Sequence, residues 1–371
     1  MSRAARAVVV GAGIAGASAA WSLADELDVV LVEAEPQPGV HATGRSAAVL
    51  SETSGHPAVC ALAAASRAFF ESPPLATPPL LSRRGLLWVG SATSAGALDA
   101  TARAARSLGI DVDELDATAA RRLVPAMRES WLDAAVLEPH AMSIDVAALL
   151  GGFLAGFRER GGALRLDRRA TACFPHGDGW RVRCGDEHID CDIVVNAAGA
   201  WADELAARSA VEPAGLSPLR RTAFTFPVPE TDEWPLVMDV AGTFYFEPEG
   251  PGLLASPAEE TPVEPHDARA DELAMARAVD ALDEATTLRV RGVTSRWAGL
   301  RTFAPDRLPV VGEDDSASGF YWLAGQGGAG IKTAPALAAV LAALVTRRPL
   351  PEELTAVGVR PEELEVGRLR R

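Results

Sequence analysis

The sequence predicts an α/β protein in which a parallel sheet, assembled from discontinuous segments, is interrupted by an inserted antiparallel-β domain of α+β character. A glycine-rich turn joins a strand to a helix between residues 7 and 27, as in a parallel βαβ unit. Residues 220–257 carry short alternating runs, typical of an antiparallel sheet with one wet face. Strand, glycine turn and helix return at residues 319–345. The first domain is expected to cover 1–80, 140–210 and 302–371, and the inserted domain 81–139 and 211–301.

The first unit has the glycine spacing of a Rossmann-like dinucleotide-binding turn. The run Ala7–Val10 is a short β-branched strand, and the helix after the turn is expected to reach about Leu27. Gly11 permits the tight turn, Gly13 lets backbone approach a pyrophosphate, and Gly16 lets the helix pack on the strand. The N-terminus of this helix then offers free N–H groups and a positive dipole end to the phosphates.

The second strand of the unit ends in an acid. An apolar run over residues 29–32 leads to Glu33, about 20 residues after the first glycine, where a carboxylate accepts ribose hydroxyls. A carboxylate here repels a 2′-phosphate, which disfavours NADP. Ile14, Ala15 and Ala34 are expected to border the same cofactor.

The remaining elements follow from periodicity and turn residues. A helix is expected near residues 59–70, and another over 146–160, capped by Ser143 or Asp145 and ended by two glycines. The apolar stretch 335–345 is well short of the roughly 20 residues that cross a bilayer, so it is expected to be a buried helix. Strands are expected at 163–166, 180–184, 188–190, 193–196, 223–226, 243–246 and 319–324.

Composition narrows the classes of partner. The net charge is −15 with a pI near 4.9, which repels phosphate backbones and anionic bilayers, so neither nucleic acid binding nor membrane insertion is expected. None of the four cysteines forms a CxxC pair, and no His/Cys cluster has metal-ligand spacing. We therefore expect no metal, and buried reduced thiols in a cytoplasmic protein. The first strand begins already at Val8, so no signal peptide is expected.

Two further segments favour FAD over NAD. Residues 43–48 put small side chains beside a polar cluster, which lets backbone pack against a pyrophosphate and a flat ring. Residues 325–332 place a second glycine-rich turn before a helix, and its N-terminus suits the negative charge that a reduced flavin develops. The expected FAD contacts in these turns and in the turn after strand 193–196 are Thr43, Gly44, Arg45, Ser46, Ala47, Ala198, Gly199, Gly327, Gly328, Gly330, Ile331 and Lys332.

The FAD is expected to be bound without a covalent link. His41 is a candidate anchor, but it lies before the small-residue cluster, and a surface or loop position is the simpler interpretation. No cysteine lies near Gly327 to form a thioether.

Longer strings add a family resemblance. The chain resembles the D-amino-acid oxidase superfamily of FAD enzymes, and its D-arginine dehydrogenase branch most of all. The resemblance covers nearly the whole chain. The strings that carry it are His41-Ala42-Thr43-Gly44-Arg45-Ser46-Ala47-Ala48, residues 64–70, Val195-Asn196-Ala197-Ala198-Gly199-Ala200-Trp201, Trp297-Ala298-Gly299-Leu300-Arg301 and Gln326-Gly327-Gly328.

The resemblance implies a substrate site. In that family a hydride passes from the substrate Cα to flavin N5 without a dedicated side-chain base, giving an imino acid and then a 2-oxo acid. The resemblance puts the carboxylate clamp on Arg301, assisted by the hydroxyl of Tyr245, with Arg221 adding positive potential. It also implies that the carbonyl of Gly328 accepts from the substrate amine. The residues themselves leave open a structural salt bridge for Arg301 and a core position for Tyr245.

Three positions depart from the arginine-preferring pattern. Leu86 stands where those enzymes carry the carboxylate that holds the guanidinium, and Val49 and Ser54 replace a histidine and a lid tyrosine. An unpaired buried charge is expensive. We therefore expect a D-amino acid with an apolar side chain, unless Leu86 points into the core and the pocket is set elsewhere.

Several alternatives stay open from the sequence alone. One is an FAD oxidase of N-alkyl amino acids, small amines or 2-hydroxy acids on the same fold. Another is a flavin-binding protein whose catalytic site has decayed, and a third is an NAD-dependent dehydrogenase. The electron acceptor is open between oxygen, a quinone and a carrier, and the resemblance to a dehydrogenase branch favours slow reaction with oxygen.

Overall fold

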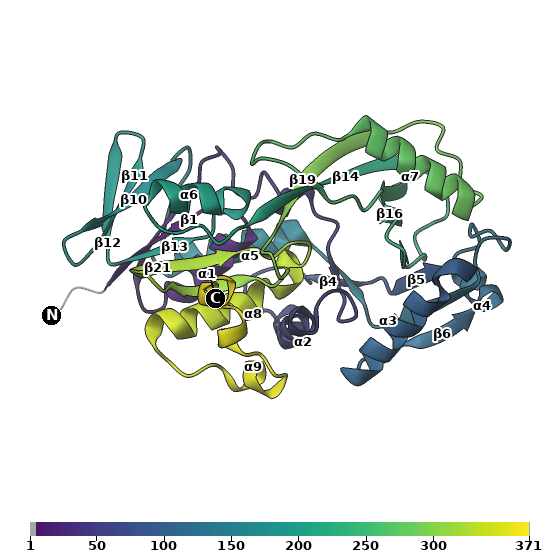
Figure 1. Ribbon diagram of the computed structural model, residues 1–371, viewed down its shortest axis with the longest axis horizontal. Helices are drawn as coiled ribbons and strands as arrows, with labels where there is room; N and C mark the ends of the chain where they lie inside the picture. The colour runs from purple at the N-terminus through teal and green to yellow at the C-terminus, as the bar shows by residue number, and fades with distance from the viewer. Residues whose placement is uncertain (1–4, 371) are drawn as a thin grey trace.

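The computed structural model describes residues 5–370 and contains an α/β part and a large, mainly antiparallel sheet (Figure 1). The α/β part is built on a six-stranded sheet in the order β20-β21-β13-β1-β2-β9, in which β20 alone runs antiparallel to its neighbour. The predicted α/β class and the assembly from distant segments are confirmed. Its strands are β1 (Arg6–Val10), β2 (Asp28–Val32), β9 (Ala163–Arg165), β13 (Ile193–Asn196), β20 (Val310–Asp314) and β21 (Ala317–Ala324).

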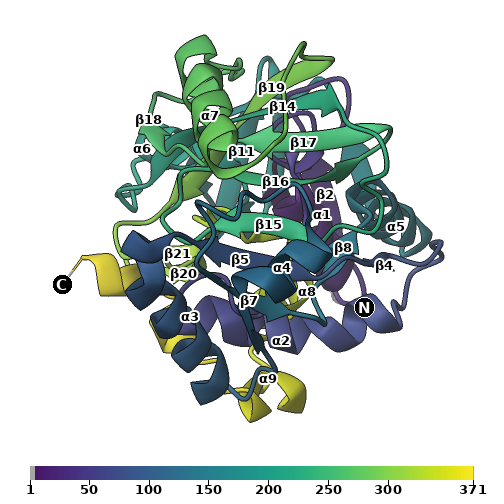
Figure 2. The ribbon, with the colours of Figure 1, turned by 90° about the vertical axis from the view of Figure 1, so that its right-hand side faces the viewer.

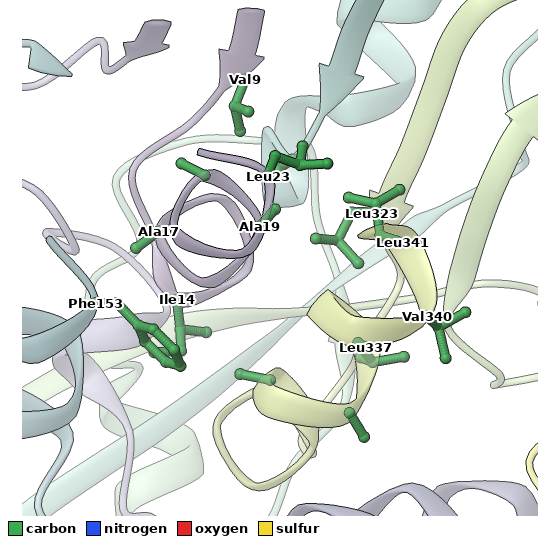
Figure 3. Packing of buried hydrophobic residues seen from close by; sticks show 14 of the residues in the cluster. Val9, Ile14, Ala17, Ala19, Leu23, Phe153, Leu323, Leu337, Val340 and Leu341 are labelled. Atoms are coloured by element: carbon green, nitrogen blue, oxygen red, sulfur yellow. The ribbon is translucent and has the colours of Figure 1, made fainter. Parts of the chain in front are cut away.

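Helices cover one face of this sheet. Strand residues of one parity, such as Val9 and Leu323, pack on Ile14, Phe153 and Leu337 from three helices (Figure 3). All are buried, because both faces of a parallel sheet are covered. The helices that contribute to this core are α1 (Ile14–Leu23), α2 (Pro57–Glu71), α5 (Val146–Glu159), α8 (Gly330–Thr346) and α9 (Glu352–Ala356).

The observed end of α1 and the observed cap of α5 can be compared with the predicted ones. The first helix ends at Leu23 and does not reach Leu27, because Asp25 and Glu26 put negative charge at the end of the helix, where the dipole disfavours it. Of the two cap candidates for α5, Asp145 is the cap, since its carboxylate accepts from the N–H of Ala148 at 2.8 Å.

The opposite face of the sheet carries a small antiparallel sheet. Val8 and Val10 of β1 pack there with Trp180, Phe320 and Trp322. Burial raises the pKa of the Cys173, Cys184 and Cys191 thiols in this layer to about 12, 11 and 12, and all four cysteines of the chain are free and buried. The layer contains β10 (Ala170–His176), β11 (Gly179–Cys184), β12 (Glu187–Cys191) and α6 (Ala202–Arg208).

The second large sheet joins residues 86–138 to residues 217–303. Its order is β18-β14-β17-β16-β15-β5-β7-β6, with β19 paired to β14. It is antiparallel as expected except that β15 runs parallel to β5, a strand from the distant earlier segment. Its strands are β5 (Leu86–Gly90), β6 (Asp113–Asp116), β7 (Ala134–Glu138), β14 (Ser217–Pro227), β15 (Leu236–Asp239), β16 (Tyr245–Glu249), β17 (Gly252–Ser256), β18 (Thr261–Pro262) and β19 (Ser295–Phe303).

The two faces of this sheet differ. One face carries an aromatic core with Phe224, Phe226, Phe244 and Phe246, under helix α7 and beside α4 (Figure 2). The other face turns toward the α/β part and carries Leu86, Tyr245 and Leu254. The helices on the aromatic face are α4 (Ala117–Leu123) and α7 (Glu272–Ala285), whereas α3 (Ala95–Ser107) packs on Trp88 and Val136, on the face that carries Leu86.

Strand β16 of the large sheet begins at Tyr245 and not at Thr243 as expected, because the N–H and hydroxyl of Thr243 bond to Asp239 in the preceding turn.

A small three-stranded sheet lies where the chain passes between the two parts. The small sheet has the order β3-β8-β4, with β3 (Val49–Leu50), β4 (Leu81–Arg83) and β8 (Met142–Ile144). Within residues 5–370 no helix is long and apolar enough to cross a membrane, and no group of three His, Cys, Asp or Glu is placed to hold a metal ion.

Candidate active site and cofactor groove

A long groove opens at the C-terminal ends of β1, β2 and β13. Its floor is the turn from Gly11 to Gly16, and this turn tolerates no side chain at either end. Gly11 has φ +100°, and a Cβ there would lie 2.6 Å from the carbonyl oxygen of Ala197. A Cβ on Gly16 would lie 1.8 Å from the carbonyl oxygen of Gly11. The sequence therefore folds this turn into a tight cradle that brings backbone to the groove.

The acid after β2 is fixed at the wall of the groove. One oxygen of Glu33 accepts from the N–H of Ala12 at 2.6 Å, and the other accepts from the N–H of Glu35 at 3.0 Å. The side chain is buried and lines the groove. A carboxylate offers about four acceptor sites, so each oxygen keeps capacity for a ligand hydroxyl.

Two helix N-termini face the same groove. Helix α1 begins after Gly13, and the N–H of Ile14 donates to the hydroxyl of Thr43 at 2.9 Å. Helix α8 begins after Ala329, which provides no side-chain cap. Ile14 and Gly330 both line the groove. Neither N-cap residue caps its helix with a side chain, and two positive dipole ends in one groove suit a ligand that carries negative charge at two separate places.

One end of the groove is aromatic and was not predicted. The ring of His41 lies against Trp201 with centroids 4.7 Å apart, and His41 Nε2 bonds to Glu35 at 3.1 Å. His41 Nδ1 is buried, and among residues 5–370 it has no hydrogen-bond partner. His41 lies in a turn, a loop position as expected, and its ring also lines the groove. An aromatic plane and an orphaned nitrogen fit a flat heteroaromatic ligand.

Arg45 has a structural task in addition to lining the groove. Its guanidinium donates to the carbonyls of Ala268 and Ala298 at 2.9 Å each, to Val40 at 3.1 Å, and pairs with Asp267. These protein groups use its charge and its donors. Arg45 therefore ties the small-residue segment to the loops of the large sheet, and it offers a cofactor little beyond its backbone.

Most of the predicted cofactor residues line the groove. Gly16 and Gly44 lie outside it and serve close packing, since a Cβ on Gly44 would lie 2.6 Å from the carbonyl oxygen of Gly39. Ala47 and Lys332 line a second cavity instead. Those in the groove are Gly11, Gly13, Ile14, Ala15, Glu33, Ala34, Thr43, Arg45, Ser46, Ala198, Gly199, Gly327, Gly328, Gly330 and Ile331.

The second cavity adjoins the groove and has a volume of about 430 Å³, within the range of small-molecule sites. Val49, Ser54 and Leu86, which the sequence singled out, all line it. Leu86 is buried on the cavity face of the large sheet and does not point away into the aromatic core. The residues that line both the cavity and the groove are Ser46, Arg221, Tyr245, Arg301, Gln326, Gly328 and Ile331.

Two guanidiniums meet at this junction. Arg221 and Arg301 lie on the paired strands β14 and β19, where Arg221 is opposite Gly299 and therefore diagonal to Arg301. Arg221 donates to the carbonyl of Glu259 at 2.9 Å and pairs with Glu260 at 3.1 Å. Burial, with a further contribution from Arg301, lowers the pKa of Arg221.

Arg301, by contrast, has no protein partner. Within residues 5–370 no carboxylate oxygen lies within 4.0 Å of its guanidinium, and no protein acceptor hydrogen-bonds to it. A structural salt bridge for Arg301 is thus absent from the described chain. Tyr245 is buried, and its side chain lines the same junction. A free, planar guanidinium beside a hydroxyl is the arrangement that grips a carboxylate by both oxygens.

A buried lysine holds the loop that carries Ser54. The Nζ atom of Lys332 donates to the carbonyls of Ser51 and Ser54 at 2.8 Å each, and burial lowers the pKa of this ammonium. From the other side, Glu138 accepts from the hydroxyl of Ser51 at 2.7 Å and from the N–H of Glu52 at 2.8 Å. The loop is therefore fixed from two directions over the cavity.

Sequence reasoning missed three carboxylates that line the cavity, of which Glu260 and Asp306 are paired with arginines and Glu247, within residues 5–370, is not. Glu247 on β16 lines the cavity and is only 6% exposed. Burial raises its pKa to about 7. The signal was available, because residues two apart on a strand share a face, and Glu247 is two positions after Tyr245.

Comparisons with known proteins agree with this architecture. The model of the DAO family, FAD dependent oxidoreductase, matches residues 6–344. The chain is 27% identical over 364 residues to glycine oxidase of Pseudomonas putida, an alignment that covers 91% of this chain and 94% of that protein. It is also 27% identical over 233 residues to mitochondrial dimethylglycine dehydrogenase of Mus musculus, covering 56% of this chain and 26% of that protein.

Some curated relatives are matched in part only. The chain is 26% identical over 247 residues to an uncharacterized oxidoreductase of Bacillus subtilis, and the alignment covers 63% of each protein. The chain thus spans less than two thirds of the length of this relative and of the dimethylglycine dehydrogenase.

Solved structures share the fold over nearly their full lengths. L-proline dehydrogenase from P. horikoshii has a TM-score of 0.82 at 19% identity, covering 100% of this chain and 99% of that chain. Iminodiacetate oxidase from Chelativorans has a TM-score of 0.80 at 22% identity, covering 97% and 98%. L-alpha-glycerophosphate oxidase from Mycoplasma pneumoniae, solved with FAD bound, has a TM-score of 0.83 at 16% identity, covering 93% and 95%.

Proposed function

Because the chain belongs to the DAO family of FAD-dependent oxidoreductases, we propose that it oxidises the Cα–N bond of an amino acid to an imino acid, which water then hydrolyses to a 2-oxo acid. The observation that carries the proposal is the unpaired guanidinium of Arg301, which lines the junction of the groove and the cavity together with Tyr245. An amino acid bound there would have its carboxylate held and its Cα facing the groove.

The residues of the groove fit FAD. The turn from Gly11 to Gly16 and the N-terminus of α1 would hold the pyrophosphate, and Glu33 would accept from the ribose hydroxyls. The N-terminus of α8, at Gly330, would stabilise negative charge on the ring system. When bound, FAD supplies a hydride acceptor at N5 for the hydrogen on the substrate Cα. We propose that no covalent link holds it.

The chain's own residues bind and orient the substrate. Arg301 would hold both carboxylate oxygens and Tyr245 would donate a hydroxyl hydrogen bond to one of them. Gly328 is a neighbour of Arg301, and its carbonyl would accept from the substrate amine. With both ends of the Cα–N unit held, orientation supplies much of the rate enhancement. Arg221 would add positive potential, reduced by its pairing with Glu260.

The finer form of the proposal concerns the side chain and the acceptor. We propose a D-amino acid whose side chain contacts the apolar walls formed by Leu86 and Val49. The closeness to D-arginine dehydrogenase, suggested by the longer strings, remains a prediction, as does a cytoplasmic location. We also propose that reduced enzyme passes its electrons to a quinone or carrier faster than to oxygen.

A second candidate is the oxidation of N-alkyl amino acids on the same clamp. The names of two similar proteins, dimethylglycine dehydrogenase and iminodiacetate oxidase, favour it. An N-substituent would occupy the same 430 Å³ cavity that otherwise takes the side chain.

The test is anaerobic mixing of the yellow holoenzyme with D-amino acids, L-amino acids and their N-methyl forms, following loss of flavin absorbance. We expect bleaching with at least one amino acid and a 2-oxo acid as product. If light with a chemical donor bleaches the flavin but no amino acid or amine does, the catalytic site has decayed and the proposal is wrong.

A further inference from the structure

We propose that Glu247 selects substrates whose side chain ends in a cation, with an aliphatic stem along the apolar walls. This inference rests on the proposed function and deepens it. It replaces the wholly apolar side chain that Leu86 alone suggests, because a carboxylate is present elsewhere on the same face of the sheet.

Strand register places Glu247 relative to Leu86. On β15, Val237 pairs with Phe246, which puts Leu236 beside Glu247. Leu236 in turn pairs with Leu86 on β5. Glu247 is therefore two strands, or roughly 10 Å of backbone spacing, from the position of the missing acid and on the same face. All three side chains line the cavity.

Glu247 has no partner within the protein. Among residues 5–370 no N–H or O–H group donates to its carboxylate, and no cation lies within 4.0 Å of it. The nearby Arg84 is used elsewhere, since it donates to the hydroxyl of Ser143 at 2.9 Å and more weakly to the carbonyl of Trp234 at 3.4 Å. The other buried acids differ. Glu33 and Glu138 each accept several hydrogen bonds.

An unpartnered carboxylate that lines a cavity is free to bind a hydrogen-bond donor or a cation of a ligand. Burying a polar group without a hydrogen bond destabilises the fold, and a donor from a ligand would remove that penalty. Burial raises the pKa of Glu247 to about 7, and Glu249 contributes to the rise while Arg84 opposes it. At neutral pH the group can therefore ionise when a cation approaches.

The length of the ligand follows from the strand. Tyr245 and Glu247 are two residues apart, so their Cα atoms are about 7 Å apart. We therefore expect a stem of about lysine length to link a carboxylate held by Arg301 and Tyr245 to a cation at Glu247. Leu236 and Met238 line the cavity and would contact the methylene groups of such a stem.

The decisive experiment measures binding to the FAD-loaded enzyme by calorimetry. The probes are 6-aminohexanoate, which is lysine without its α-amine, and hexanoate, which also lacks the terminal ammonium. We expect 6-aminohexanoate to bind at least about tenfold more tightly at pH 8. Glu247→Leu should abolish this preference and Glu247→Gln should reduce it, while Glu249→Gln, which removes an exposed charge from the same strand, should keep it. Equal binding of the two probes to wild type, or a preference that survives Glu247→Leu, would overturn the inference.

Turnover separates this inference from the proposed function. Lysine and norleucine, in both enantiomers, differ only in the terminal ammonium, and we expect flavin reduction to favour lysine in wild type and norleucine in Glu247→Leu. If the probes bind as expected but no amino acid reduces the flavin, the proposed function fails and the cation site stands. If amino acids reduce the flavin without discrimination between lysine and norleucine, the cation site fails and the proposed function stands.

Discussion

The guanidinium of Arg301 lies directly over the backbone of Gly328, so close that a Cβ on Gly328 would come within 2.6 Å of Nη1. The glycine leaves the space that the arginine occupies at the junction of groove and cavity. The obstructed atom is the free end of a flexible side chain, so a larger residue would displace the arginine and leave the fold intact.

Gly328→Ala should therefore give a folded, yellow enzyme with a displaced clamp. We expect kcat/KM for the best amino acid to fall about 10- to 100-fold, because a carboxylate bond to a charged partner is worth roughly 1.5–3 kcal/mol. Steady-state kinetics with a dye acceptor measures it. Gly151→Ala is the matched control, since a Cβ there meets nothing within 4 Å. Unchanged kinetics in Gly328→Ala would mean that Arg301 does not act from this position.

Removing the guanidinium of Arg301 should lower kcat/KM more than displacing it does. Arg301→Met keeps an unbranched stem but removes the guanidinium and its charge, so kcat/KM should fall by an amount equivalent to several kcal/mol of transition-state stabilisation. Tyr245→Phe removes one hydroxyl and should cost about 1–2 kcal/mol. Arg296→Met, an exposed arginine on the same strand, is the control. Wild-type activity of Arg301→Met on a carboxylate substrate would contradict the assignment.

The cofactor prediction is checked by acid precipitation. All of the yellow colour should pass to the supernatant as FAD, because no covalent link is expected. Colour in the pellet that disappears in His41→Ala would reverse this expectation, since the Nδ1 atom of His41 is buried in the groove without a protein partner.

Glu33→Arg should weaken FAD retention strongly. The substitution removes the acceptor expected for the ribose and also the bonds to the N–H groups of Ala12 and Glu35 that shape the turn. FAD occupancy after gel filtration measures the effect. Full occupancy would show that the ribose lies elsewhere.

The sequence predicted the groove better than the cavity, for a physical reason. The first βαβ unit and the turn at residues 325–332 are local, so glycine spacing and periodicity were enough to find them. The bonds that tie Arg45 to Ala268 and Ala298 could not be predicted, because these partners are 223 and 253 positions away. No local pattern encodes such contacts.

Glu247 was missed for a related reason. Alternation showed that β16 has two faces, but it did not show that the face bearing Tyr245 turns inward to a cavity. One face of the sheet was expected to be wet, and Tyr245 was assigned to the substrate site without its neighbour two positions along the strand being considered. Only the packing of the large sheet against the α/β part reveals that this acid is buried.

The folding stability should depend on pH through Glu247. The pKa of Glu247 is raised from 4.5 to about 7 in the folded protein, chiefly by burial, with Glu249 adding to the rise and Arg84 opposing it. Below about pH 4.5 folded and unfolded chains are both protonated, and the group has no effect. Between 4.5 and 7 the folded chain binds the extra proton, so stability falls as pH rises through this window. Above 7 the full penalty applies, on the order of 3 kcal/mol.

Glu247→Gln cannot ionise, so it should escape this penalty. The melting temperature of the ligand-free holoenzyme should be higher in Glu247→Gln than in wild type at pH 8, and the difference should shrink toward zero at pH 5. Glu264→Gln, an exposed acid outside the cavity, should show no such trend. At pH 8, saturating 6-aminohexanoate should stabilise wild type more than Glu247→Gln, because the ammonium then pairs the buried charge. A difference between Glu247→Gln and wild type that is the same at both pH values would mean that Glu247 is not buried as a carboxylate, and the cation site would lose its physical basis.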